Sequence, residues 1–591
     1  MARLTTTHSL GHRRRVLVGA ALVVALVAFG AVRVMLGGWA PLAADDARYL
    51  YVGLSILDGH GPVGPSGTVF LLRSPIYGLA LALGSPLGSD PVAGARIVAA
   101  TLGLLGLTGA GRLGWRLAGP GGAIGTAVAL VSIPLVWNLI PSLRIDLTQT
   151  AVIVAALLAI SRPTIRRWAI GGALIGLAIL VKETAAPILI LPVALLGSVP
   201  RPHLARITLA FIGAAAIVAG WWWVVVWVSS GQVFPFNALA VIETRDVDVA
   251  IRLDRSAIPL IGSMVVAWAL VAWRARHDVG HRMLLIAALA LSPAAIYAAS
   301  RGLNARNFAG LAVLSAIAIG VGGAWLVGTL RARWVVATPA VGARAFPPRP
   351  LAALVLAGVA LVSPAIALIG QRDLERQPAD RLPEQLSGWL AANTADGDRI
   401  AMAFRDREQV AVRRFDHTDV ALLPAVRVDP MEPPESYLWM GLRDQQLFGY
   451  RRTDWVAALT DPAVDLLILV APHPLTPVEL TATPQTASRL GLTPAATFET
   501  DGDRAEIDRV DSAVAVAGTP AVPLHLSVDA AGAWLALRDG DAATGFLAAR
   551  PVVVGSDGAI RALLDRLGGR GCSQPAERSA AEIRPAGSCG G

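Results

Sequence analysis

The chain has 591 residues, of which 54% are hydrophobic and only 16% charged, and its mean hydropathy is +0.57. This composition is too apolar for a soluble globular protein and predicts a polytopic membrane protein. The net charge of +9 does not indicate a nucleic-acid partner, because the basic residues lie in short loops between apolar runs, where they act as topology signals.

The first apolar run, at about 16–36, follows three consecutive arginines and is long enough to cross a bilayer. It is longer than the apolar part of a secretory signal, so we expect an uncleaved first span. The arginines predict that the N-terminus is cytoplasmic and that the residues after the span lie outside the membrane.

Residues 37–91 are half-polar and predict an outer loop rather than a span. Leu50, Leu54 and Leu57 recur at helical spacing, which indicates a short helix along the membrane surface. A Gly- and Pro-rich turn region follows, and the apolar segment at 73–87 predicts a second interfacial or re-entrant helix.

Further apolar segments recur with short connections and, with the first run, predict about eleven spans. They lie at about 92–111, 121–140, 147–161, 168–182, 185–198, 208–228, 257–273, 283–299, 308–329 and 351–370. Arginine-rich loops alternate with acidic loops without a conflict, which gives a consistent inside and outside. The expected fold class is a polytopic α-helical membrane protein, with a membrane domain at 1–370.

An odd number of spans leaves the tail outside the membrane. Residues 371–511 turn polar and predict an α/β domain, with a helix at 381–392, strands at 398–404 and 464–470, a helix near 475–490 and a strand pair near 496–510. Residues 512–591 are rich in Ala, Gly and Pro and give no clear elements, and we expect disorder at 568–591. The only cysteines, Cys572 and Cys589, lie here, and the sequence leaves open whether they pair.

Two adjacent carboxylates, Asp45 and Asp46, directly follow the first span, with Arg48 and Tyr49 beside them. Neighbouring anions at a membrane boundary cost free energy unless they bind a cation or a polar substrate, or lie in water. This stretch is therefore the first candidate site of the chain.

The stretch from Ala44 to Tyr49, followed by Arg73-Ser74-Pro75-Ile76-Tyr77, resembles the first-outer-loop signature of GT-C-fold membrane glycosyltransferases, in the branch of aminoarabinose transferases and protein O-mannosyltransferases. The resemblance implies transfer of a sugar from a polyprenyl-phosphate donor at the outer membrane face. It implies that Asp45 acts as the base on the acceptor hydroxyl, and that Asp46 positions groups or holds a divalent metal. Ser74 in place of a proline, and Leu72 in place of a metal-binding Glu, argue against the aminoarabinose sugar and its zinc site.

Further candidates lie at the outer ends of later spans. Arg144 and Asp146 precede the fourth span, and Asp146 matches a family Asp that could share a divalent cation with Asp46; both could also simply end helices in headgroup water. Lys182 is the only lysine of the chain, which favours a phosphate contact over generic anchoring. Arg301 lies in a polar outer loop that suits phosphate or sugar and is equally consistent with a loop that is only solvated. Arg48, Tyr49 and Arg73 complete the expected donor-binding set.

The sequence therefore predicts a multi-pass cell-membrane glycosyltransferase, with a polyprenyl-phosphate-linked sugar as donor. Its acceptor would be an envelope glycan, a lipid or a secreted protein, with membrane lipid around the spans and no nucleic-acid partner. Two alternatives stay open: a flippase or other transporter of lipid-linked sugars, and a non-catalytic envelope scaffold. A transporter should show inverted repeats and mid-membrane charges, and the sequence shows neither.

Overall fold

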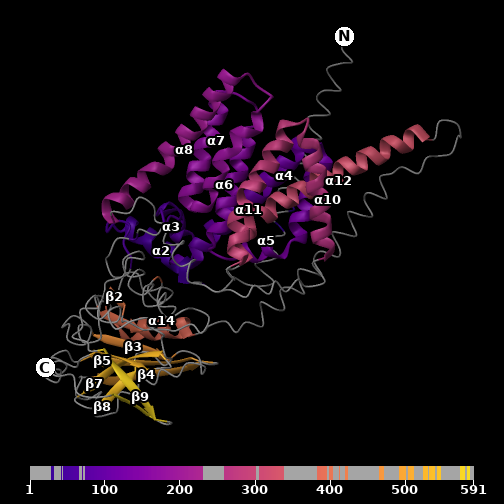
Figure 1. The fold of residues 1–591 in the computed structure, drawn as a ribbon. Helices are drawn as coiled ribbons and strands as arrows, with labels where there is room; N and C mark the ends of the chain where they lie inside the picture. Colours follow the sequence, from indigo (N-terminus) through magenta and orange to yellow (C-terminus); the bar gives the residue numbers. More distant parts are fainter. Residues whose placement is uncertain are drawn as a thin grey trace. The chain divides into compact units, whose positions relative to one another are not determined.

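The structure is a computed structural model in which helices follow one another up to residue 337 and strands dominate the tail (Figure 1). It describes residues 42, 44–64, 70, 73–230, 258–300, 305–337, 382–395, 398–403, 419–422, 465–471, 492–500, 503–510, 524–529, 532–539, 542–546, 573–579 and 582–585, and the single positions 25, 28, 30, 31 and 412. The predicted span at 351–370, the predicted helix at 475–490, and Arg301 lie outside the described residues. So does the predicted span at 16–36, apart from positions 25, 28, 30 and 31.

The described chain divides into two compact units. One contains the long apolar helices from residue 95 to residue 337, and the other contains residues 42–94 and the tail. Helix α4 (Pro91–Ser132) begins just before the first unit and continues into it. The other helices of this unit are α5 (Pro134–Leu139), α6 (Ile145–Ala159), α7 (Ile165–Val181), η2 (Glu183–Leu195), α8 (Arg201–Ser230), α10 (Ile258–Ala275), α11 (Val279–Ser300), η4 (Ala305–Phe308) and α12 (Ala309–Ala337).

Six of these helices, α6, α7, α8, α10, α11 and α12, coincide with predicted spans. Among the described residues, three helices are long and apolar enough to cross a membrane by length and composition: Pro91–Ser132, Arg201–Val228 and Ala309–Thr329. The total of eleven spans stays a prediction.

Helix α4 combines two helices across a kink, as the two separate predicted segments require. Ala118 and Gly119 leave helical geometry, with Gly119 at a φ of 69°, and Pro120 begins the second part. A positive φ suits glycine, and proline lacks the N–H that a helix interior would use, so the break follows from the sequence.

Residues 185–198 were expected to form a membrane span, but the structure has a 3-10 helix there, η2, which ends at Leu195. Pro187 and Pro192 lie inside it and cannot donate the backbone hydrogen bonds of an α-helix. The 3-10 form rises about 2 Å per residue, so thirteen residues extend about 26 Å, against roughly 20 Å for an α-helix of that length.

Helices α7 and α8 pack at close range through small residues. A side chain added at Gly172 would lie 2.0 Å from the carbonyl oxygen of Phe211, and one at Gly176 would lie 2.7 Å from that of Ala215. This Gly-x-x-x-Gly spacing lets helix backbones approach each other in a membrane. On α8, Leu209 and Ile217 are 75% and 80% exposed, which suits a lipid environment and not water.

The second unit begins with two short helices, α2 (Ala44–Leu57) and α3 (Ile76–Ala82), followed by the 3-10 turn η1 (Ser85–Leu87). These confirm the two helices that the sequence predicted within the 37–91 loop. A side chain added at Gly53 would lie 2.0 Å from the carbonyl oxygen of Gly78, and one at Gly78 would lie 2.2 Å from that of Tyr49. Helices α2 and α3 therefore touch backbone to backbone.

The described tail contains helix α14 (Leu382–Asn393) and two five-stranded sheets. The first sheet has the order β2-β1-β3-β5-β4, in which β1 pairs with β2 and β3 in parallel and β5 pairs with β3 and β4 antiparallel. Its strands are β1 (Arg399–Ala403), β2 (Asp419–Leu422), β3 (Leu466–Ala471), β4 (Leu492–Thr500) and β5 (Asp503–Val510). The structure has a helix, two strands and a strand pair where the sequence predicted them. The separate α/β domain at 371–511 stays a prediction.

The second sheet lies in the region that the sequence left unassigned. Its order is β10-β9-β6-β7-β8, formed by β6 (Leu524–Asp529), β7 (Gly532–Asp539), β8 (Ala542–Phe546), β9 (Ser573–Ser579) and β10 (Glu582–Pro585). Residues 568–591 were expected to be disordered, whereas the structure places β9 and β10 there. Composition misses these strands because their pairing partners lie elsewhere in the chain, such as Leu526 opposite Ser573.

Candidate active site

The two adjacent acids begin helix α2, and the helix gives them different surroundings. Both lie in its first turn, where the helix dipole favours negative charge. Asp46 is 1% exposed, whereas the side chain of Asp45 is 38% exposed and lies 3.5 Å from the Arg48 guanidinium. Of the two carboxylates, Asp45 is therefore the one that a substrate can reach.

Tyr49 of the acidic motif and Arg73 of the later Arg-Ser-Pro segment meet in an aromatic cluster between α2 and α3. The Tyr49 ring packs edge-on against Phe70 and Tyr77, at centroid distances of 6.2 and 6.0 Å. The Arg73 guanidinium lies 5.8 Å from the centre of the same ring, within the range of a cation–π contact. Tyr49 is 6% exposed, so its ring is covered by these neighbours.

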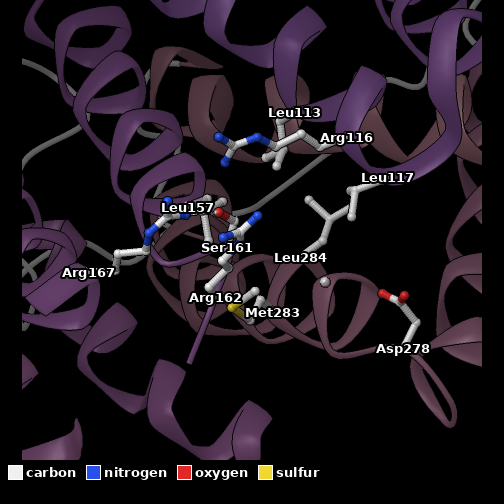
Figure 2. A pocket seen from close by; sticks show the side chains of 11 residues that line it. Leu113, Arg116, Leu117, Leu157, Ser161, Arg162, Arg167, Asp278, Met283 and Leu284 are labelled. Carbon is white, nitrogen blue, oxygen red and sulfur yellow. Dashed lines mark hydrogen bonds between the residues drawn. The ribbon is translucent and has the colours of Figure 1, made fainter. Parts of the chain in front are cut away.

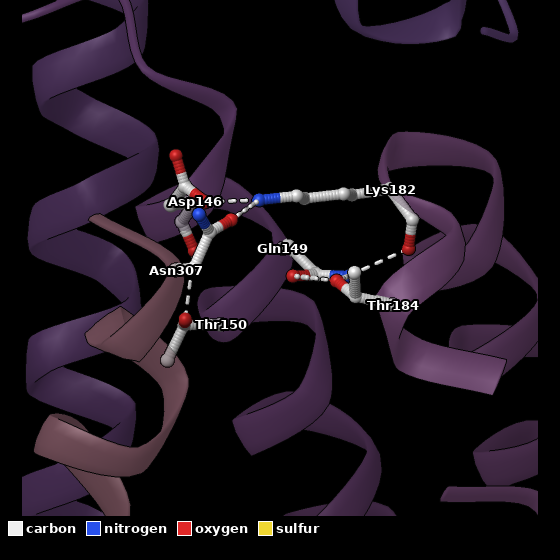
Figure 3. Close-up of polar contacts among 6 residues, drawn as sticks. All are labelled: Asp146, Gln149, Thr150, Lys182, Thr184 and Asn307. Atoms are coloured by element: carbon white, nitrogen blue, oxygen red, sulfur yellow. Dashed lines mark hydrogen bonds and ion pairs between the residues drawn. The ribbon is translucent and has the colours of Figure 1, made fainter. Parts of the chain in front are cut away.

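A second polar centre lies in the first unit, where three elements meet (Figure 3). The Lys182 ammonium, at the end of α7, donates to Asp146 Oδ1 at 2.6 Å and to Asn307 Oδ1 at 2.7 Å. Lys182 and Asp146 are 6% and 4% exposed. Burying two charges in an apolar helix bundle is costly, and their pairing offsets that cost.

A side-chain amide holds the backbone of this lysine in place. Gln149 donates to the backbone carbonyl of Lys182 at 2.6 Å and to the Thr184 hydroxyl at 3.1 Å (Figure 3). One turn along α6, the Thr150 hydroxyl donates to the carbonyl of Asp146 at 2.7 Å. The centre is thus a network of hydrogen bonds and not an isolated ion pair.

The predicted site residues fall into two groups. Asp45, Asp46, Arg48, Tyr49 and Arg73 come together in the α2–α3 pair of the second unit. Arg144, which directly precedes α6 and is half-buried, belongs to the first unit with Asp146 and Lys182.

Sequence reasoning missed Gln149 and Phe70. A signal for Gln149 was present, since it lies three residues after Asp146 on an otherwise apolar helix and so shares its face.

The divalent metal expected between Asp46 and Asp146 is not tested by the described residues. The two residues belong to separate units, and Asp146 Oδ1 already bonds the lysine ammonium. Within the described ranges, no group of three or more His, Cys, Asp or Glu side chains could hold a metal ion. A metal at this pair therefore stays an untested prediction.

Comparison with known proteins identifies the fold. No protein-family model and no curated protein sequence matches the chain. Among solved structures, ArnT from Cupriavidus metallidurans in the apo state is similar, with a TM-score of 0.55 and 16% identity over 84% of this chain and 99% of ArnT. The same ArnT bound to undecaprenyl phosphate gives a TM-score of 0.57 and 17% identity over 83% of this chain and 98% of that one. The chain is therefore a polytopic membrane protein with the fold of ArnT, the GT-C fold that its motif predicted.

Proposed function

We propose that this protein is an integral-membrane glycosyltransferase that takes a sugar from a polyprenyl-phosphate donor. The observation that carries the proposal is the ArnT-like fold over most of the chain, since one of the ArnT structures holds undecaprenyl phosphate. The acidic motif at the start of α2 supports it, because a transferase of this kind needs a base for its acceptor.

In the proposed reaction, the acceptor hydroxyl oxygen attacks the anomeric carbon of the donor sugar. The bond from that carbon to the phosphate oxygen breaks, the phosphate leaves with the bonding electrons, and the configuration inverts. Asp45 takes the hydroxyl proton, which fits its partial exposure, while Arg48 at 3.5 Å fixes the carboxylate. Buried Asp46 positions the start of α2.

The leaving phosphate gains negative charge and needs a cation. Arg73, on the Tyr49 ring, is the proposed cation in the α2–α3 pair. Lys182 stays a second proposed phosphate contact; in the structure two of its three N–H donors bond Asp146 and Asn307, so a phosphate would compete with these two oxygens for the ammonium. The Asn307 amide, which is neutral, is the cheaper of the two to displace.

The proposed acceptor is an envelope glycan, a lipid or a secreted protein on the outer membrane face. The charge pattern of the loops supports this face, since the acidic motif follows a span whose arginines precede it. The mannosyltransferase-like character is part of the proposal and rests on the motif alone, and the motif names no particular sugar.

The experiment compares envelope glycans and secreted glycoproteins by mass spectrometry in a deletion strain and in strains carrying Asp45→Asn or Asp58→Asn. Asp58 is an exposed acid just after α2 and gives a matched control for the charge change. We expect the deletion and Asp45→Asn strains to lose the same sugar, because removal of a general base slows a reaction by about 10²- to 10⁴-fold. The Asp58→Asn strain should retain it.

Purified protein separates the enzyme from the alternatives. Wild-type protein should release polyprenyl phosphate from its sugar-linked donor, and Asp45→Asn should not. A protein that moves the intact donor across a vesicle membrane without cleaving it would be a transporter, and the glycosyltransferase proposal would then be wrong.

A further inference from the structure

A cavity of about 400 Å³ lies in the first unit, where the first part of α4, the loop between α6 and α7, and the start of α11 meet. Its polar walls include Arg116, Arg162 and Arg167, and its apolar walls include Leu113 and Leu284 (Figure 2). We call it the arginine pocket. The proposed glycosyl transfer uses none of these residues.

Two of the three arginines have hydrogen-bond partners in the described part of the chain, and none of the ion pairs there includes any of the three. Arg116 donates to the backbone carbonyl of Leu158, and Arg167 donates to the Ser161 hydroxyl at 3.1 Å. Figure 2 shows the guanidinium groups of Arg116 and Arg162 directed into the space between the labelled side chains. The pocket thus gathers three positive charges, none of which forms an ion pair among the described residues.

One acid, Asp278, also lines the pocket, on the other side of Leu117 and Leu284 from the arginines (Figure 2). Its carboxylate accepts from the backbone N–H of His281 at 2.9 Å and lies 2.8 Å from the ring Nδ1 of the same residue. Burial raises the pKa of Asp278, but the hydrogen bonds from His281 outweigh this effect and hold it below its usual range. The carboxylate is therefore ionised at neutral pH, and the pocket keeps a net positive charge.

From this geometry we infer that the arginine pocket binds the phosphate group of an anionic membrane phospholipid. Guanidinium groups bind phosphate oxygens in a bidentate way. The three positive charges of the arginines exceed the single negative charge of Asp278, so an anion is favoured. The leucines on the other walls suit the adjoining glycerol and acyl chain, whereas a soluble phosphate would gain nothing from them. Basic pockets between membrane helices bind lipid head groups in this way.

The location supports a lipid over a soluble ligand. The pocket lies among the arginine-rich loops, which the charge pattern assigns to the cytoplasmic face. Ile165 and Ile170 on the neighbouring α7 are 42% and 47% exposed, so apolar surface that faces lipid begins beside the arginines. Arginines at such a boundary lie at head-group depth.

The test uses full-length protein in phosphatidylcholine nanodiscs, titrated with short-chain phosphatidylglycerol and followed by native mass spectrometry. The variants are Arg162→Gln, the double variant Arg162→Gln/Arg167→Gln, and Arg166→Gln as the matched control. Arg166 carries the same charge in the same loop region but does not line the pocket. Thermal unfolding of each variant verifies that it is folded, and Arg162→Gln keeps the test valid if loss of the Arg167–Ser161 bond disturbs the loop.

We expect wild-type protein and Arg166→Gln to bind phosphatidylglycerol equally and the double variant to bind it roughly 30-fold more weakly, as loss of two head-group contacts predicts. Arg162→Gln should weaken binding by roughly fivefold. Asp278→Asn should strengthen binding, because it removes the opposing charge.

Equal affinity of the double variant and Arg166→Gln would overturn the proposal. So would binding of inorganic phosphate, dependent on Arg162, in a protein that binds no phosphatidylglycerol.

Discussion

At the scale of single residues, the buried pair of Lys182 and Asp146 is the contact whose energetics are most sharply defined. The side chains of Lys182 and Asp146 are 6% and 4% exposed. Loss of one charge would leave the other buried, without water and without an opposite charge, so each depends on the other. The 2.7 Å bond from Lys182 to Asn307 ties η4 to the same lysine. The pair therefore couples α6, α7 and η4 through one ammonium group.

We expect Lys182→Met to lower the free energy of unfolding by about 3–5 kcal/mol, because it leaves the Asp146 carboxylate buried without a cation. The double variant Lys182→Met/Asp146→Asn should be more stable than Lys182→Met alone, since it buries no charge. Thermal unfolding in detergent measures both. The single variant Asp146→Asn completes the cycle. If the stability changes of Lys182→Met and Asp146→Asn simply add in the double variant, the residues are not coupled and this account of the pair fails.

The same variants bear on the proposed donor contact. If Lys182 has only a structural role, its substitution should lower stability. The donor concentration that gives half-maximal rate should then be unchanged in the fraction of protein that remains folded. A phosphate contact should raise that concentration in Lys182→Met, and Lys182→Arg should restore it in part because it keeps a positive charge.

At the scale of elements, the position of the acidic motif depends on the contact between α2 and α3. The backbone of Gly78 lies against that of Tyr49 and Gly53, so the turn of α2 that carries the motif rests on α3. The aromatic cluster of Tyr49, Phe70 and Tyr77 extends this contact on the side-chain level. Any side chain between the helices must separate them and move Asp45.

We expect Gly78→Ala to destabilise the protein by about 1–3 kcal/mol, since its Cβ would lie 2.2 Å from a backbone oxygen that cannot give way locally. Sugar transfer should fall with it, because Asp45 shifts. Gly213→Ala, on α8 in open space, is the matched control and should be neutral or slightly stabilising. Thermal unfolding and the transfer assay measure both; an unchanged Gly78→Ala protein would show that the helices are not in contact.

The elements also show what a sequence reveals. Apolar runs predicted α6, α7, α8, α10, α11 and α12 because a long apolar segment in a membrane must satisfy its backbone hydrogen bonds internally, which favours a helix. The two prolines of η2 are visible in the sequence, but the apolar pattern around them predicts a span and does not distinguish a 3-10 helix from an α-helix. The bonds from Lys182 to Asp146 and Asn307 span 36 and 125 residues, and no local pattern encodes such distances.

At the scale of the whole molecule, charge is distributed by side. The sequence around Arg116, Arg162 and Arg201, at one set of span ends, contains few acids, whereas Asp45, Asp58 and Asp90 occur between spans of the other set. Under the positive-inside rule, this pattern predicts that the loops around the arginine pocket are cytoplasmic and that the residues of the α2 motif lie outside the membrane. The topology is a prediction from charge, and it can be tested directly.

We expect intact cells to distinguish these faces by cysteine labelling. In a background with Cys572→Ser and Cys589→Ser, Asp58→Cys should react with a membrane-impermeant maleimide, because the charge pattern places the end of α2 outside. Arg201→Cys, at the start of α8, should react only after the membrane is permeabilised; both positions are exposed, so access to the reagent and not burial decides the result. Labelling of Arg201→Cys in intact cells, with protection of Asp58→Cys, would invert the topology and place the transfer reaction on the cytoplasmic side.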